Sequence, residues 1–338
     1  MNEPDVAIII LNWNGLALTK SCLKSIAEQS YKNYRIIVID NGSVDGSQAW
    51  LEKQEVILIK NRKNKGFARG INKGLKEALE LNVKYAVALN NDVVLDKNWL
   101  KILVKFMEKN KHVGFAQGAS MQFKDRKIYD STGIYLERGF IPNQRASGKD
   151  SPQLDMPAIG PNAAGAIYRS TMLKSIRHSV NEYFDRMFFA YVEDVDFNLR
   201  CTVRGYEFAY VEEAIMYHVG SATGNKIARR KMFWGARNMV WLAYKNAPFT
   251  ILRKTIRSII KSHLANLQYL YKNQRKNFWP YFLGLTIGII GIPLFMNKRF
   301  HNLHEMKITN DRFYELLVQS NPPLINPLRN LKKLLKYK

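Results

Sequence analysis

The sequence of 338 residues is poor in cysteine: it has two, Cys22 and Cys201, and their spacing fits neither a metal site nor a redox pair. A disulfide-stabilised scaffold is therefore excluded, and free thiols of this kind are typical of a reducing compartment. We also expect no secretory signal peptide, because the sequence opens with acidic residues and its first apolar run, "VAIIIL", predicts a β-strand. We therefore expect the protein to be located in the cytosol.

Acidic residues are scarce in the last third of the chain. Residues 221–338 contain 22 Lys and Arg but 3 Asp and Glu, whereas residues 1–220 are nearly balanced. Such a region binds nucleic acid or an anionic membrane surface. The basic residues here accompany an apolar segment, since the stretch "FWPYFLGLTIGIIGIPLFMN" at 278–297 carries no charge. We predict that residues 226–338 form a basic amphipathic helical region at a membrane, while a full span, an interfacial segment and a buried helix pair all stay open for 278–297.

The chain lacks the glycine fingerprints of ATP-binding and dinucleotide-binding loops. Its basic, glycine-containing stretch "NKGFARGINKG" has neither spacing, so neither ATP nor NAD is indicated. Lys65, Arg69 and Asn72 stand where a loop enters a predicted helix, which is a favourable place for a diphosphate. A basic helix face without any ligand is the alternative.

Apolar runs alternate with helical periods in the first half of the chain. The runs "VAIIIL", "RIIVID", "EVILIK", "YAVALN" and "VGFAQG" predict strands, and the segments between them predict helices. This alternation indicates a mostly parallel, doubly wound α/β sheet. Residues 120–157 break the rhythm and predict a hairpin or a mobile loop. Two short strands, "EFAYV" and "AIMYHV", are expected later, and helices from Met232 onward.

Polar residues follow several of the predicted strands. Ligands of such sheets bind at the carboxyl ends of the strands, so we expect a site there. Asp40 has two readings: it holds a strand-to-helix turn, or its carboxylate accepts the N3 hydrogen of a pyrimidine ring. The residues that we expect at this edge are Asn12, Asp40, Asn41, Asn90, Asn91 and Asp92.

The stretch "YAVALNNDVVLD" delivers a single carboxylate, Asp92, where a metal site favours two. His218, at the end of another predicted strand, is a candidate second ligand. The stretch "FFAYVEDVDFNLR" carries Glu193, Asp194 and Asp196 behind aromatic residues. These acids either favour a helix N-terminus or line a partly dry pocket in which one carboxylate acts as a general base.

Taken together, the motifs resemble the family 2 glycosyltransferases, particularly their bacterial rhamnosyltransferase-like branch. They occur in the family's order over about residues 5–240: "VAIIILNWNG", "VIDNGSVDGS", "NKGFARGINKG", "ALNNDVV", "GPNAAGAIYRSTML", "FFAYVEDVDFNLRCTVRGY", "YHVGSAT" and "GARN". The resemblance implies a GT-A fold (Rossmann-like, mostly parallel sheet). It also implies inverting transfer from a nucleotide-diphosphate sugar with a divalent metal, Mg²⁺ or Mn²⁺. Residues 1–225 would form the catalytic domain, with a nucleotide-binding half at 1–118 and an acceptor half at 119–225.

The resemblance also implies roles for individual residues. Asp194 matches the catalytic base, and Asp92 with His218 matches the metal site. Asn90 departs from the family's Asp-x-Asp signature. Glu193 and Asp196 are candidates for stabilising the transition state. The residues expected on the donor are Asn12, Asp40, Asn41, Arg69, Asn72, Asn90 and Asn91.

We therefore expect a glycosyltransferase at the cytoplasmic face of a bacterial membrane, in surface polysaccharide synthesis. The favoured donor is dTDP-rhamnose, with a UDP-sugar as the other option, and the expected acceptor is a lipid-linked glycan. Two other functions stay open: a basic nucleic-acid-binding α/β protein, and a non-catalytic membrane scaffold. Against nucleic acid, the aromatic residues cluster in apolar helices and do not alternate with Lys and Arg on strands.

Overall fold

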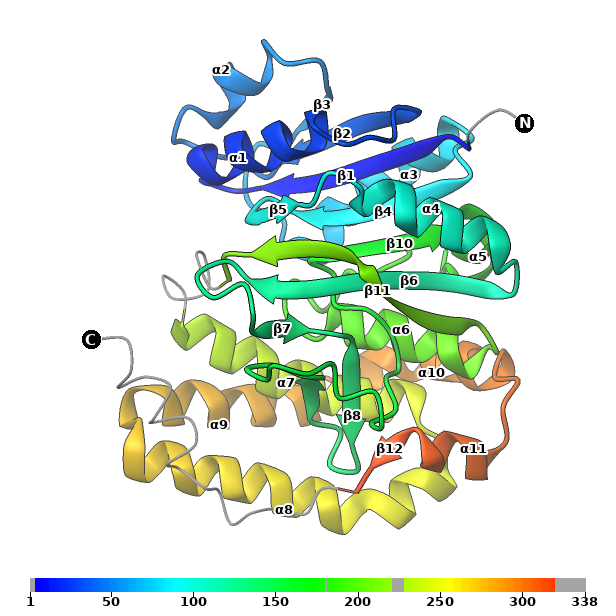
Figure 1. The fold of residues 1–338 in the computed structure, drawn as a ribbon. Helices are drawn as coiled ribbons and strands as arrows, with labels where there is room; N and C mark the ends of the chain where they lie inside the picture. Colours follow the sequence, from blue (N-terminus) through cyan, green and yellow to red (C-terminus); the bar gives the residue numbers. More distant parts are fainter. Residues whose placement is uncertain (1–3, 180, 221–227, 320–338) are drawn as a thin grey trace.

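The computed structural model describes residues 4–179, 181–220 and 228–319, and its centre is a large sheet (Figure 1). This nine-stranded sheet has the order β3-β2-β1-β4-β10-β6-β11-β5, with β7 beside β6. Strands β1 to β4, β6 and β11 run in one direction, and β5, β7 and β10 run in the other. The predicted mostly parallel α/β sheet is confirmed, with reversed strands in its second half.

The elements of the sheet and its covering helices follow the predicted alternation. The strands are β1 (Val6–Asn12), β2 (Tyr34–Asp40), β3 (Ile57–Lys60), β4 (Tyr85–Asn90), β5 (Val93–Leu95), β6 (Val113–Gln122), β7 (Tyr129–Ser131), β10 (Gly165–Arg169) and β11 (Glu207–His218). The helices are α1 (Leu16–Ala27), α2 (Ser47–Leu51), α3 (Phe67–Glu80), α4 (Trp99–Lys109), α5 (Ser170–Ile176) and α6 (Glu193–Val203).

Strand β1 shows why the sheet is covered on both faces. Its side chains alternate between two cores: Ile8 and Ile10 pack with α1 and α4, whereas Ala7 and Ile9 pack with α3. Because successive side chains of a strand point to opposite faces, a continuous apolar run needs a cover on each side. The glycines of α3 allow a close approach, since a Cβ on Gly74 would lie 2.2 Å from Ile9 Cγ2.

The rest of the described chain forms a helical region and a second, small sheet. The remaining elements are α7 (Ala228–Asn246), α8 (Phe249–Asn273), α9 (Arg275–Ile290), the 3-10 helix η2 (Ile292–Phe295), α10 (Met296–His304) and α11 (Asn310–Glu315). A small sheet, in the order β12-β8-β9, is made of β8 (Ile134–Glu137), β9 (Pro142–Gln144) and β12 (Leu317–Val318). Helices α7 to α9 share a hydrophobic core with β8 and α6. The chain within 120–157 is thus partly ordered as strands.

The two short strands expected at 207–218 are one bulged strand, β11. Its register against β6 shifts between Val211 and Ile215, and the two intervening glutamates, Glu212 and Glu213, are exposed. Gly118 of β6 makes room for the bulge, because a Cβ there would lie 1.9 Å from the carbonyl oxygen of Ala214. The interruption in the apolar pattern marks a bulge and not a strand end.

A buried ionic cluster joins the sheet half to the helical region. The ammonium group of Lys245 in α7 lies 2.7 Å from a carboxylate oxygen of Asp185 and 2.7 Å from one of Asp196 in α6, and all three side chains are fully buried. Arg200 pairs with Asp196, and Lys298 of α10 pairs with Asp185. These cations hold the pKa of Asp185 below its usual value against the effect of burial. The cluster therefore ties α6, α7 and α10 together.

We expect Lys245→Met to destabilise the protein by about 3 kcal/mol, because it leaves two buried carboxylates short of a cation. Urea unfolding followed by circular dichroism at neutral pH measures this. The matched control, Lys261→Met on an exposed position of α8, should change the free energy of unfolding by less than about 0.5 kcal/mol. Equal stability of the two variants would show that the cluster does not hold the helices together.

Candidate active site

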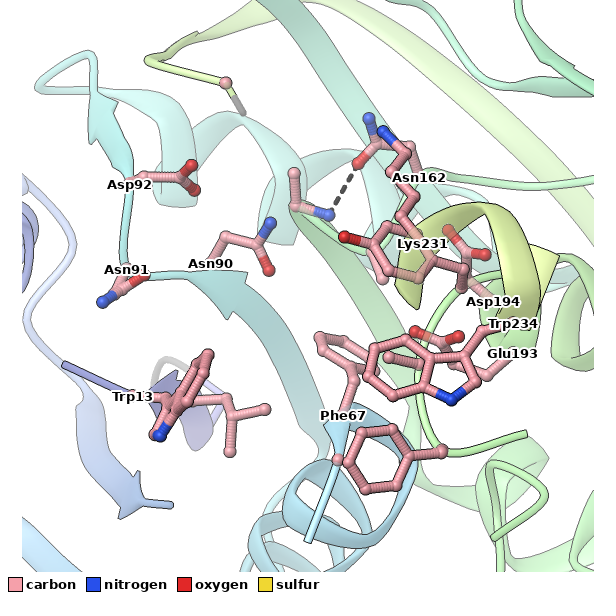
Figure 2. Close-up of a pocket in the computed structure, with 18 of the residues that line it drawn as sticks. Trp13, Phe67, Asn90, Asn91, Asp92, Asn162, Glu193, Asp194, Lys231 and Trp234 are labelled. Atoms are coloured by element: carbon pink, nitrogen blue, oxygen red, sulfur yellow. Dashed lines mark hydrogen bonds between the residues drawn. The ribbon is translucent and has the colours of Figure 1, made fainter. Parts of the chain in front are cut away.

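A pocket of about 670 Å³ opens where β1 and β4 end and where α3, α6 and α7 begin (Figure 2). This edge is the one at which open α/β sheets bind ligands. The wall combines amides, carboxylates, aromatic rings and cations. Its lining residues are Leu11, Trp13, Asn41, Asn64, Gly66, Phe67, Asn90, Asn91, Asp92, Asp130, Gln144, Asn162, Ala163, Ala164, Phe189, Ala190, Tyr191, Glu193, Asp194, His218, Gly220, Arg230, Lys231 and Trp234.

At one side of the pocket His218 stands between two carboxylates. Its Nε2 lies 3.3 Å from an oxygen of Asp92, and its Nδ1 lies 2.8 Å from an oxygen of Asp130. The strands explain the geometry: β11 lies between β5, which Asp92 precedes, and β6, which pairs with the strand β7 that carries Asp130. Burial opposes a charge on the imidazole, but the bonds to Asp130 and Asp92 raise the pKa of His218 to about 10.

Asp92 and His218 fit a divalent ion, and Asp130 fits a supporting role. Asp92 offers an oxygen ligand on the pocket wall, and the Nε2 of His218 offers a nitrogen ligand once an incoming metal has displaced its proton. Asp130 contacts Nδ1, the other nitrogen of the His218 ring, so its carboxylate lies on the side of the ring opposite to Asp92. A histidine that binds a metal through one nitrogen commonly donates the other N–H to a carboxylate, which fixes the orientation of the ring.

The two asparagines before Asp92 differ in their contacts. The amide of Asn91 donates to Oδ1 of Asn12 and to Oγ1 of Thr19, each at 3.0 Å. Asn91 therefore anchors the end of β4 to β1 and α1 while it lines the pocket. Asn90 stands on the pocket wall (Figure 2).

At the other side of the pocket α6 begins with Glu193 and Asp194. Phe189, Tyr191 and Val192 before it have positive φ angles between 65° and 71°, which non-glycine residues rarely adopt. The amide of Asn238, in α7, holds this turn by donating to the carbonyls of Phe188, Ala190 and Tyr191 at 2.6 to 3.1 Å. Strain held in this way is common at functional sites and here aims the first turn of α6 into the pocket.

The two carboxyl groups have different surroundings. Asp194 accepts a hydrogen bond from the backbone of Val195 at 2.8 Å and another from Ala163. Burial raises its pKa, and these bonds limit the rise. Burial and the neighbouring Asp194 raise the pKa of Glu193 well above its usual value, and one of its oxygens finds no partner among the described residues. Glu193 is therefore the carboxyl group that is more readily protonated, and Asp194 is the one that more readily stays anionic.

Asp196 does not reach the pocket, although the sequence placed it beside Asp194. It faces the opposite side of α6, where it binds Arg200, Lys245 and the amide of Asn246. Two residues along a helix turn a side chain by about 200°, so an acid two positions from a pocket residue points away from the pocket. Asp196 therefore has structural contacts, and the fold does not bring it into the pocket with Glu193 and Asp194.

The residues expected on the nucleotide divide into pocket and framework. Asn41 lines the pocket. Asp40 and Asn12 are fully buried and lie outside its lining. The carboxylate of Asp40 accepts hydrogen bonds from Asn12, Gln48 and the backbone of Gly42 and Ser43. Of its two readings, the structure shows the strand-to-helix turn.

Arg69 and Asn72 also lie outside the pocket. Arg69 is exposed on α3. Asn72 is buried, donates to the carbonyl of Phe184 at 2.7 Å and accepts from the backbone of Tyr183 and Phe184. Asn72 therefore fixes the segment that leads to α6, and neither side chain is among those that line the pocket. The start of α3 does line the pocket, through Gly66 and Phe67.

Several wall residues were not predicted as site residues. Trp13 and Phe67 lie within the quoted motifs "VAIIILNWNG" and "NKGFARGINKG" and could have been included with them. Asp130 belongs to a three-residue strand inside the irregular stretch, so only its pairing with β6 reveals it. Lys231 and Trp234 sit at the start of α7, and their place in the site depends on how α7 packs.

One other group of potential ligands converges in the described part of the chain. Ligand atoms of His178, Asp185 and Asp196 lie within 4.8 Å of one another. Lys245 already pairs with both carboxylates, and burial with the nearby Arg200 lowers the pKa of His178 well below its usual value. A divalent ion would meet cations in this place. We therefore regard this cluster as structural and the Asp92–His218 pair as the candidate metal site.

The architecture defines the class of the protein as a GT-A-like α/β fold. The structure is similar to that of the mannosyltransferase PcManGT from Pyrobaculum calidifontis, solved with GDP-Man and Mn²⁺. The TM-score is 0.54 at 14% identity, over 100% of this chain and 85% of that one. A likeness at this identity concerns the fold alone.

Residues 7–166, just under half of the chain, match the family model described as Glycosyl transferase family 2. An uncharacterized glycosyltransferase of Haemophilus influenzae is 31% identical over 145 residues, which are 41% of this chain and 44% of that protein. The chain thus aligns with less than half the length of this relative. The O-antigen chain rhamnosyltransferase RfbN of Salmonella typhimurium is 22% identical over 76% of this chain and 87% of its own length.

We expect Asp130→Ala to weaken Mn²⁺ binding in the presence of a nucleoside diphosphate about 10- to 100-fold, because His218 loses the group that orients it. Asp130→Asn should recover much of the affinity, since its amide oxygen still accepts the Nδ1 hydrogen. Titration calorimetry measures the affinity without reference to turnover. Asp150→Ala, at an exposed acid, is the control, and a loss as large for Asp150 as for Asp130 would contradict the positioning role.

Proposed function

We propose that the protein is an inverting, metal-dependent glycosyltransferase that moves a sugar from a nucleotide-diphosphate donor to an acceptor hydroxyl. The observation that carries this proposal is that one pocket holds the pair Asp92 and His218 and a further carboxyl group, Asp194, at separate places. Figure 2 shows Asp92 on one side and Asp194 on another. Donor activation and acceptor deprotonation need such separated groups. The family 2 domain supports the same reaction class.

The donor side of the proposal rests on Asp92 and His218. A divalent ion held by these two residues would neutralise the charge that develops on a diphosphate leaving group. Asn90 and the backbone at the start of α3 offer neutral hydrogen-bonding groups around the same space. The presence of GDP-Man and Mn²⁺ in the structurally similar mannosyltransferase supports this choice of ligands.

The acceptor side rests on Asp194. Its carboxylate takes the proton from the acceptor hydroxyl while the oxygen attacks the anomeric carbon and the diphosphate departs. One displacement from the side opposite to the leaving group inverts that carbon. A general base works best with a pKa close to the working pH, and burial moves the pKa of Asp194 in that direction.

For the sugar we propose rhamnose from dTDP-rhamnose, transferred to a lipid-linked glycan at the cytoplasmic face of a bacterial membrane. The motif resemblance supports it, as does the distant similarity to an O-antigen chain rhamnosyltransferase. A UDP-sugar is the next donor to test, because the pocket shape and not the catalytic groups selects the sugar.

A panel of nucleotide sugars with Mn²⁺ or Mg²⁺ tests the reaction class, and Asp194→Asn tests the base. At least one donor should be hydrolysed or transferred, and Asp194→Asn should lower kcat at least about 100-fold while donor binding stays nearly unchanged. Activity should fall as the pH drops through the raised pKa of Asp194, above the ordinary aspartate value of about 3.9.

Glu193→Gln is the matched control for this experiment. It keeps the shape and the neutral state of that side chain, so kcat should fall by less than about 10-fold. If Glu193→Gln abolishes turnover and Asp194→Asn does not, the base is Glu193. If no donor reacts with the unmodified protein, the proposal of a glycosyltransferase fails.

We also expect the metal to bind weakly until a nucleotide is present. Asp92 and His218 supply two ligands, whereas Mn²⁺ and Mg²⁺ favour about six, so phosphate oxygens are needed to complete the site. Adding dTDP or UDP should tighten Mn²⁺ binding at least about 10-fold in a calorimetric titration. Tight binding to the nucleotide-free protein would mean that other acids take part.

A further inference from the structure

Helix α9 and the elements after it expose an apolar face. Along α9 the exposed side chains recur at helical spacing, and the same surface continues through η2 and α10. We call this set the α9 face: Trp279, Phe282, Leu283, Ile287, Ile289, Ile290, Leu294, Met296 and Phe300, exposed between 38% and 69%. Outside 249–300, the exposed large hydrophobic residues in the described chain are four scattered ones. Such a concentration indicates a surface with a partner.

The opposite side of α9 is fixed to the protein. A Cβ on Gly284 would lie 2.4 Å from the carbonyl oxygen of Phe233 in α7, so the two helices touch through backbone atoms. The indole of Trp241 donates to the carbonyl of Gly288 at 2.9 Å. On the side of α8, the hydroxyl of Tyr281 bonds to His263. Because of these contacts, α9 presents one face outward and cannot leave α7 without exposing buried groups.

The charges around the α9 face have one sign. No Asp or Glu occurs in the sequence from Ala214 to His304. Arg275 and Lys276 are exposed at the start of α9, and Arg253, Arg257 and Lys261 are exposed on α8. An apolar face beside cations suits the interface of an anionic bilayer, where apolar side chains enter between lipid headgroups and cations meet phosphates.

Two other occupants fit less well. A second copy of the chain, packed face to face, would bring the same cations against one another without acids to pair them. None of the helices in the described ranges is by itself long and apolar enough to span a membrane. The bent pair Arg275–Ile290 and Ile292–His304, with a 59° break between its helices, does reach the necessary length and apolar character when the two are taken together. The anchoring of α9 along α7 argues against inserting that pair across a bilayer.

We propose that the α9 face inserts shallowly into an anionic bilayer and holds the protein at the membrane surface without crossing it. The position of α7 links this face to the pocket: Trp234 lines the pocket, and its neighbour Phe233 contacts Gly284 of α9. The packed pair of helices α7 and α9 therefore separates the pocket from the lipid surface. An acceptor anchored in the bilayer would meet the pocket at this edge, a clause that rests on the proposed transfer reaction. The proposed insertion of the α9 face into the bilayer does not depend on that reaction.

The test is binding of the full chain to vesicles of phosphatidylcholine mixed with phosphatidylglycerol, measured by sedimentation. The triple variant Phe282→Ser, Leu283→Ser, Ile290→Ser should lower the partition coefficient at least about 30-fold. Its control, Val44→Ser with Leu154→Ser, removes exposed apolar residues away from the α9 face and should bind as the unmodified protein does. Vesicles of phosphatidylcholine alone should bind more weakly and with less dependence on salt.

Three results would overturn the proposal. The triple variant could bind the mixed vesicles as well as the unmodified protein does. Light scattering could show a dimer that the triple variant abolishes, which would assign the face to a second copy. Vesicle-bound protein could resist extraction by alkaline carbonate, which would indicate a span. A thermal shift with dTDP and Mn²⁺ is measured on every variant. A variant that loses vesicle binding but keeps the shift has lost membrane binding with an intact pocket, whereas a lost shift in that variant alone indicates a misfolded pocket. Absence of the shift in the unmodified protein counts against the proposed transferase function and leaves the vesicle result valid.

Discussion

The buried contact of Lys245 with Asp185 and Asp196 is the interaction on which the site depends most. Asp196 belongs to the first turn of α6, the turn that carries Glu193 and Asp194 into the pocket. Lys245 belongs to α7, so the helical region holds α6 from behind while Asn238 of the same helix holds the strained turn in front. The direction of the proposed base is thus set by α7. A catalytic half without its helical region would lack both contacts.

The same helix organises the rest of the molecule. Its first turns supply Lys231 and Trp234 to the pocket, and its outer side receives the glycines of α9. Buried ion pairs seldom add much net stability, because desolvation offsets most of their attraction. Their value here is geometric: two buried carboxylates accept a cation in few arrangements, so α7 has one position relative to α6. This position relates the pocket to the α9 face.

Local patterns in the sequence predicted the strands, the helices that cover them and the edge at which ligands bind. They also singled out Asp92, His218 and Asp194, which the fold brings into one pocket. Patterns failed where the outcome depends on packing between distant segments. Asp194 and Asp196 look alike in the chain, but a turn of the helix separates a pocket wall from a buried ionic cluster. Asn72 and Asp40 have partners that only the folded chain brings near them.

The single carboxylate of "NNDVV" is explained by what the fold places around it. A second acid at position 90 would add negative charge to a pocket wall that already holds Asp92 and Asp130. The site instead uses Asp130 to orient His218 and keeps Asn90 neutral. Because the protein offers few charged ligands, the phosphates of the proposed donor would have to supply the remaining metal ligands. Metal and donor would then enter together, and the pocket would hold a complete metal site only when a sugar nucleotide is present to react.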